Sequence, residues 1–265
     1  MSEHLLDAVV RDTVPPLAWL GGGPYFALTM VVMQVGHFWL LNHYGVLGFL
    51  VYLLLAASMF TLDGFVSNSF GHNVRVLRAN GFSDATIVGT MAFNTVFSQI
   101  ITLVVIHYIG NPAAMADLLR LESYSVATVT CILVNLALSE VFFYAAHKVL
   151  HESWPSIHVM HHCCKSSSHA TNVIFHPVDL AFEFGGPGGV VLALHYLLWD
   201  QNLTVLLATY IFIQTYYAID HNEWLRTYHY KHHAQIDAVY TIYVSHRADP
   251  RKDLVRHLVV KPKSN

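Results

Sequence analysis

Charged residues are scarce in this sequence. Lys, Arg, Asp and Glu together make up 12% of its 265 residues, whereas 54% are hydrophobic, a balance that is unusual for a soluble protein. Long stretches contain no charge at all, and none occurs between Thr13 and Leu62. Because one bilayer crossing needs about 20 apolar residues, the composition argues against a soluble protein and predicts an all-α, polytopic membrane protein.

Four of the expected spanning helices lie in the N-terminal half of the chain. A turn-like segment from Asn42 to Gly45 divides the first uncharged stretch into a hairpin of two helices. Two further uncharged stretches, Ala85 to Ala116 and Ser123 to Ser139, predict a third and a fourth crossing. We therefore expect residues 1–139 to form a region of transmembrane helices.

The second half, residues 140–265, combines apolar stretches with many histidines. Its uncharged stretches at 184–199 and 201–219 are separated by Asp200 and predict a further hairpin, either shallow or fully spanning. With a cytoplasmic N-terminus, Arg120 is the only one of the 14 Lys and Arg residues in an external loop. Since positive charge is retained in cytoplasmic loops, the histidine-rich part is expected to form a cytoplasmic helical cap.

Cysteine is scarce, and the sequence has no excess of positive charge. The chain has three cysteines, two of them adjacent at Cys163 and Cys164, which do not make a disulfide framework and are expected to be free thiols. The formal net charge is −3. The basic run from Arg247 to Lys263 is explained by membrane topology or anionic headgroups, so no nucleic-acid partner is expected.

Histidine is the residue type that stands out among those present. Twelve of the 19 histidines lie between positions 147 and 233. Imidazole is a good ligand for transition metals, and residues three or four apart share a face of a helix. Eight histidines have this spacing and predict a metal centre at the membrane surface: His147, His151, His158, His161, His162, His229, His232 and His233.

The number of these histidines indicates two metal ions. Eight imidazoles exceed the four ligands of one tetrahedral zinc ion and suit two ions, each with an open position. Pro155 predicts the end of the helix that carries His147 and His151, followed by a short new helix. Glu140 lies two helical turns before His147, where it either orients a ligand histidine or caps a polar pocket.

The order of these motifs resembles the fatty acid hydroxylase and sterol desaturase superfamily of integral membrane di-metal oxidases. The segment that starts at Glu140 and includes Tyr144 is similar to the acidic residue and tyrosine before that family's first histidine box. Phe175 to Asp179 is similar to the FHPVD stretch of sterol C-5 desaturases. The resemblance implies that Glu140 and Tyr144 are catalytic residues and that His176 and His221 join the eight clustered histidines as metal ligands.

The resemblance also implies an activity. A pair of iron ions would activate dioxygen and oxidise an unactivated lipid C–H bond, by desaturation or hydroxylation. The FHPVD stretch favours a sterol, with a fatty acyl or sphingolipid substrate as the alternative. The sequence contains no nucleotide-binding glycine motif and no haem-binding module, so electrons are expected from a separate carrier. The resemblance implies that they come from NAD(P)H through a reductase, often by way of cytochrome b5, and these proteins are the expected partners. Lys261 and Lys263 resemble a dilysine retrieval signal and, with the resemblance, predict the endoplasmic reticulum.

Two other classes of protein use similar residues. A zinc-dependent lipid hydrolase needs a general base near the metal, for which Glu140 or Asp179 would have to serve. A membrane metal transporter places its ionisable residues near the middle of the bilayer. Here the histidine clusters lie at the expected helix ends, which favours the oxidase.

Overall fold

The computed structural model describes residues 6–7, 23–66, 68–109, 112–165, 169–197, 202–221, 225–236 and 239–260. Within these residues the protein is all-α, as predicted, and β-type pairing is limited to an isolated bridge between Val239 and Arg247. The expected dilysine signal at Lys261 and Lys263 lies outside the described residues, as does the beginning of the first uncharged stretch, at 13–22.

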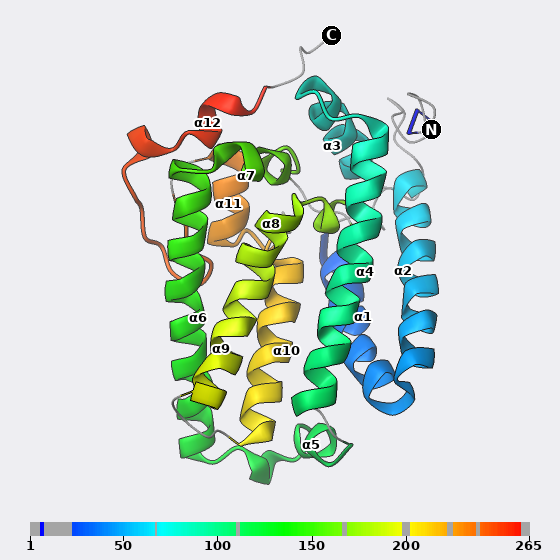
Figure 1. Ribbon diagram of the computed structural model, residues 1–265, viewed down its shortest axis with the longest axis vertical. Helices are drawn as coiled ribbons and strands as arrows, with labels where there is room; N and C mark the ends of the chain where they lie inside the picture. Colours follow the sequence, from blue (N-terminus) through cyan, green and yellow to red (C-terminus); the bar gives the residue numbers. More distant parts are fainter. Residues whose placement is uncertain are drawn as a thin grey trace.

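The body of the molecule is a bundle of upright helices (Figure 1). Helix α10 contacts α1, α6 and α9, so it occupies an inner position in the bundle. The upright helices are α1 (Gly23–Tyr44), α2 (Val46–Val66), α4 (Asp84–Ile109), α6 (Val126–Glu152), α9 (Gly186–Leu197) and α10 (Leu203–Ile219).

Shorter helices cover the two ends of the bundle (Figure 1). One end, called here the histidine end, carries α3 (Asn68–Ala79), α7 (Pro155–His162), α11 (Tyr228–Gln235) and α12 (Val255–Leu258). The opposite end carries α5 (Pro112–Asp117), which the short helix η2 (Leu121–Ser123) follows in the chain. The short helix α8 (Pro177–Leu180) and the π-helical segment η4 (Ala181–Gly185) lead directly into α9.

The predicted hairpin of the first two helices is present. Helix α1 ends at Tyr44, α2 begins at Val46, and the residue between them, Gly45, has a φ of +50°. Glycine adopts this left-handed conformation without the steric penalty that a Cβ atom brings. The backbone N–H of Gly45 donates to the carbonyl of Leu41, so the turn terminates α1 and reverses the chain.

Among the described residues, three helices are long and apolar enough to cross a membrane. They cover Asp84–Val105, Val126–Glu152 and Pro177–Leu197, whereas Val46–Leu62 and Leu203–Ile219 are shorter apolar helices. The expected count of four secure crossings is therefore not confirmed. The third of these helices belongs to the pair that was expected to be either shallow or spanning. Leu54 and Val141 are 71% and 65% exposed, as side chains that face lipid would be.

Basic residues concentrate at the histidine end. Arg75 and Arg78 lie on α3, Lys231 on α11 and Arg256 on α12. Arg120 follows α5 at the opposite end. This separation is the one that the charge distribution predicted, and it gives the bundle one basic end beside the histidine clusters.

Candidate metal centre

The first two histidine motifs follow the predicted break between two helices. Helix α6 ends at Glu152 and α7 begins with Pro155, because proline is tolerated in the first turn of a helix and disfavours a helical residue before it. His147 and His151 lie one turn apart on α6, with their Nε2 atoms 3.0 Å apart. The break turns α7 so that the Nε2 atoms of His158 and His162 also reach Nε2 of His151, at 3.1 Å and 3.0 Å.

The third motif lies on a short, capped helix. The Thr227 side chain accepts a hydrogen bond from the backbone N–H of Tyr230 and caps the start of α11. Ile236, with a φ of +49°, ends the helix in the left-handed conformation. The spacing within the motif then places His229, His232 and His233 inside the molecule, each at most 1% exposed.

Five histidines from α6, α7 and α11 converge on one point and are called here the five-histidine cluster. Its central member is His151, whose Nε2 atom lies 3.0 Å or 3.1 Å from the Nε2 atoms of the other four. All five side chains are fully buried. The members are His147, His151, His158, His162 and His232.

Four further histidines form a second group, called here the four-histidine cluster, which contains His161, His221, His229 and His233. The Nε2 atom of His221 lies 3.2 Å, 3.0 Å and 3.1 Å from those of His161, His229 and His233, respectively. Its members are between 0% and 6% exposed. The two clusters adjoin, because the His162 and His233 rings stack with their centroids 4.1 Å apart.

Buried carboxylates lie against the outer nitrogens of three histidines, and those of Asp253 and Asp179 form hydrogen bonds there. Asp253 Oδ1 lies 2.8 Å from His151 Nδ1, and Asp179 Oδ2 lies 2.9 Å from His158 Nδ1. Asp220 Oδ1 lies 2.6 Å from Nδ1 of His221, the residue that follows it. A carboxylate that accepts the Nδ1–H of an imidazole fixes the tautomer and directs the Nε2 lone pair away from itself.

The inner nitrogens therefore face one another as acceptors. When Asp253 and Asp179 accept the Nδ1 protons, the Nε2 atoms of His151 and His158, 3.1 Å apart, both present lone pairs. Two acceptors at this distance repel each other unless a cation lies between them. The donor set thus fits a metal ion better than a hydrogen-bonded histidine core.

The histidines outside the long helices are held neutral. Burial, and then the neighbouring histidines, hold the pKa of His161, His162, His229 and His233 well below its ordinary value. A neutral imidazole is the form that ligates metals. These four side chains are therefore in the ligating form at neutral pH.

Glu183 also reaches the centre and was missed by the sequence analysis. It lies in η4, is 3% exposed, and forms a candidate metal-binding group with His147 and His158. A signal existed, because an ionisable residue within an apolar, membrane-spanning stretch marks a functional site by default. Asp253 was missed as well, and nothing in its surroundings in the sequence indicates that it lies beside His151.

Three candidate residues do not join the clusters. His176 is exposed, and its Nδ1 accepts the backbone N–H of Val178, capping α8. Glu140 Oε1 accepts the backbone N–H groups of Ile242 and Tyr243, both at 3.0 Å. Both of these contacts are made to the backbone of a segment distant in sequence and not to His147. Tyr144 packs its ring against His246, with centroids 5.2 Å apart. The other nine candidate histidines are brought together.

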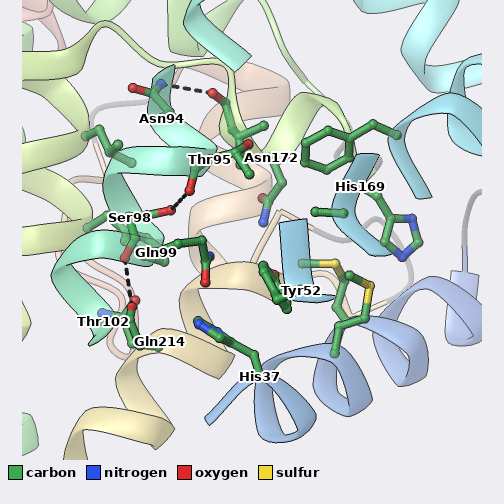
Figure 2. A pocket seen from close by; sticks show the side chains of 17 residues that line it. His37, Tyr52, Asn94, Thr95, Ser98, Gln99, Thr102, His169, Asn172 and Gln214 are labelled. Carbon is green, nitrogen blue, oxygen red and sulfur yellow. Dashed lines mark hydrogen bonds between the residues drawn. The ribbon is translucent and has the colours of Figure 1, made fainter. Parts of the chain in front are cut away.

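A cavity of about 60 Å³ lies between α1, α2, α4 and α10 (Figure 2). Polar side chains from different helices point into it, among them His37, Gln99 and Gln214. A neighbouring cavity of about 90 Å³ is more apolar, and the two share Leu180 and Phe184 as lining residues. The α8–η4 segment therefore lines the cavities and also carries Asp179 and Glu183 toward the histidines.

No protein-family model, no curated protein and no solved structure matches this chain.

Proposed function

We propose that this protein is a membrane oxidase that uses a pair of iron ions and dioxygen to oxidise a lipid C–H bond. The observation that supports this proposal is the pair of adjoining, buried histidine clusters, nine imidazoles in all. The order of the histidine motifs, which resembles the fatty acid hydroxylase and sterol desaturase superfamily, supports the choice of activity.

The charges around the clusters support two divalent ions. Four carboxylates, those of Asp179, Glu183, Asp220 and Asp253, are between 0% and 3% exposed. Their ion-pair partners among the described residues are histidines, which are neutral when they ligate a metal. Were all four ionised, four buried negative charges with neutral partners would be very unfavourable. Two divalent cations would balance them.

The spacing of the ligand atoms supports ions with more than four ligands. Two nitrogens bound at about 2.1 Å to one ion lie about 3.0 Å apart at a right angle and about 3.4 Å apart at the tetrahedral angle. In the five-histidine cluster, the distances from His151 Nε2 are 3.0 Å to 3.1 Å. Right-angled ligands suit iron better than a tetrahedral zinc ion.

The protein's own residues would hold, orient and shield the ions. The nine histidines would provide the ligands, and Asp253 and Asp179 would fix the tautomers of His151 and His158. Their nearly complete burial would exclude bulk water from the reaction. The bound iron pair would supply the activation of dioxygen, which protein side chains cannot perform alone.

The two cavities support a lipid substrate that carries a polar group. His37 and Gln99, 2% and 6% exposed, lie in the polar cavity, where they could bind a hydroxyl group. Phe97, Ile101 and Leu192 line the apolar cavity, whose lining suits a hydrocarbon body and whose volume of about 90 Å³ would have to widen to hold one. A sterol has both parts and is the substrate we propose, with a fatty acyl or sphingolipid substrate as the alternative.

The histidine end is where we expect an electron carrier to bind. Electrons from NAD(P)H would arrive through cytochrome b5 and its reductase, at the histidine end. Basic residues at that end, such as Arg256 and Lys231, would attract an acidic carrier. We place the enzyme in the endoplasmic reticulum, with the histidine end in the cytoplasm.

The test is a comparison of the lipids of cells that express the intact protein, His161→Ala or His43→Ala. His43 is exposed near the end of α1, and its replacement controls for the loss of a histidine. The host must contain sterols and a working reductase. We expect the intact protein and His43→Ala, but not His161→Ala, to produce a lipid lighter by two hydrogens or heavier by one oxygen.

Labelled oxygen distinguishes the oxidase from a hydrolase. If the product gains oxygen, growth under ¹⁸O₂ labels it when the protein is an oxidase, whereas a hydrolase takes its oxygen from water. If the intact protein yields no lipid lighter by two hydrogens or heavier by one oxygen, the result would contradict the proposal and favour metal transport or hydrolysis.

A further inference from the structure

Glu183 lies between the two histidine clusters and directs one carboxylate oxygen toward each. Its Oε1 atom is 3.4 Å from Nε2 of His147 and 3.7 Å from Nε2 of His158, both in the five-histidine cluster. Its Oε2 atom is 3.4 Å from Nε2 of His161, in the four-histidine cluster. Thus the two oxygens of one carboxylate face two different sets of nitrogen atoms.

All three distances are too long for strong hydrogen bonds, and the two of 3.4 Å are those of two ligands on one ion. Hydrogen bonds between nitrogen and oxygen are about 2.7–3.2 Å long, and the histidine contacts of Glu183 are longer. A nitrogen and an oxygen that each lie about 2.1 Å from the same ion are roughly 3.0–3.4 Å apart. Oε1 meets this criterion with His147 and Oε2 meets it with His161, both at 3.4 Å, whereas the 3.7 Å between Oε1 and His158 lies outside it.

We propose that Glu183 bridges the two metal ions, with Oε1 bound to the ion of the five-histidine cluster and Oε2 to the ion of the four-histidine cluster. The inference rests on the proposed di-metal centre and adds a ligand that the histidine motifs do not contain. One negative charge between two dications lowers their mutual repulsion. A shared carboxylate also couples the two ions electronically.

The local structure explains how this carboxylate reaches the centre. Asp179, which binds His158, lies four residues before Glu183, so the two acids share one face while Leu180 and Phe184 line the cavities. The π-helical turn from Ala181 to Gly185 carries Glu183, and such turns occur frequently at functional sites. An acid in a spanning helix is expensive, and a bridging role accounts for it.

A different explanation makes an opposite prediction. A protonated Glu183 that shares its proton with Asp179 would be neutral and would need no metal. Glutamine has the shape of protonated glutamate and carries no charge. Replacement by glutamine therefore separates the two explanations, because it imitates the protonated acid and removes the bridge.

The experiment uses the full-length protein in detergent, loaded with ferrous ion enriched in ⁵⁷Fe. Bound iron is counted by mass spectrometry, and magnetic coupling between the ions is measured by Mössbauer spectroscopy and magnetic susceptibility. The variants are Glu183→Gln, Glu183→Asp and the control Glu122→Gln. Glu122 is exposed in η2, beyond α5 at the other end of the bundle.

We expect the unchanged protein and Glu122→Gln to bind two coupled irons. Glu183→Gln should bind the second iron about 10- to 100-fold more weakly, in the range seen when groups supporting a metal site are removed, and the coupling should disappear. Glu183→Asp keeps the charge on a shorter side chain, so it should retain more iron than Glu183→Gln. This variant also keeps the test decisive if Glu183→Gln fails to fold.

Two results would overturn the inference. If Glu183→Gln binds two irons with unaltered coupling, Glu183 does not bridge, while the di-metal proposal survives. If the unchanged protein binds no pair of irons, the proposed function fails first and the bridge fails with it.

Discussion

At the scale of single residues, His176 is the position where the family resemblance and the geometry predict different behaviour. The resemblance makes it a metal ligand, but its side chain is exposed and caps α8. We expect His176→Ala to retain both metal ions and to lose about 1 kcal/mol of stability with the cap. His161→Ala and His232→Ala should each lose metal and activity while the protein still inserts into the membrane.

The measurement is metal content per purified protein, together with the temperature of unfolding. His43→Ala is the matched control, because it removes an exposed histidine near the end of α1 that lies away from α7 and α11. Loss of one metal ion from His176→Ala would restore His176 as a ligand. Unchanged metal content in both His161→Ala and His232→Ala would contradict the assignment of the clusters.

Asp253 provides a second test at this scale. Its carboxylate accepts the Nδ1–H of His151, the central member of the five-histidine cluster. Burial raises the pKa of Asp253 to about 6, so the group is mostly ionised at neutral pH. Asp253→Asn keeps the size but removes the charge that makes His151 a stronger ligand. We expect about 10- to 100-fold weaker metal binding.

Competition with a chelator measures this change, and Asp249→Asn is the matched control. Asp249 pairs at the surface with Arg251, whose side chain is 88% exposed, and such a pair contributes little to stability. Equal metal affinity in the two variants would show that Asp253 does not position His151. Recovery of affinity in Asp253→Glu would support the role of the charge.

A site residue is easier to predict when its partner lies close to it in the sequence. His147 and His151 are four residues apart, so helical periodicity alone brings their nitrogens together. Asp253 binds His151 across 102 positions of sequence, and no spacing rule connects them. His176 shows the converse, because a motif match placed it among the ligands while the start of α8 turns its side chain outward.

At the scale of secondary-structure elements, the approach of α9 to α6 determines where Glu183 lies. A Cβ atom at Gly186 would lie 2.2 Å from Cε1 of Phe142 on α6. Gly186→Ala therefore requires the Phe142 ring or α9 to move. We expect a loss of about 1–3 kcal/mol, as for other overpacked sites, and weaker binding of metal because Glu183 moves with α9.

Gly189→Ala is the matched control on the same helix, since a Cβ atom there meets open space. It should be neutral or stabilising, because alanine favours helix by up to about 1 kcal/mol over glycine. Thermal unfolding and metal content measure both variants. Phe142→Leu should restore part of the loss in Gly186→Ala. If Gly186→Ala matches Gly189→Ala, the close approach does not constrain the centre.

Helix ends were easier to predict than irregular helical turns. Pro155 and the turn at Gly45 have local causes, a restricted φ and a left-handed residue, and both breaks are present. The π-helical turn at Ala181–Gly185 has no comparable local signal in the sequence. The expected hairpin therefore began at 184, one residue after the acid that enters the centre.

At the scale of the whole molecule, one basic end carries the metal-binding groups and an apolar bundle carries the cavities. The positions of the Lys and Arg residues along the sequence predicted that one end of the bundle would be basic. The number of crossings was harder to predict. Helix α10 is short and packs against α1, α6 and α9, so its apolar residues contact protein, and hydropathy cannot distinguish this environment from lipid.

The clusters also couple the stability of the whole protein to metal and pH. In the metal-free protein, burial and neighbouring histidines hold the pKa of His161, His162, His229 and His233 well below its ordinary value. In the unfolded chain each pKa is about 6.5, so the unfolded state binds more protons near and below that pH. Stability must then fall as the pH falls.

We expect the chelator-treated protein to unfold several degrees lower at about pH 6 than at about pH 8. Bound metal keeps the imidazoles deprotonated, so the loaded protein should unfold at a higher temperature and depend less on pH until the ions dissociate. Thermal unfolding in detergent, with and without chelator, measures both effects. A chelated protein with the same unfolding temperature at both pH values would mean that the clusters are already protonated or exposed, which contradicts the buried, neutral centre on which the proposed chemistry depends.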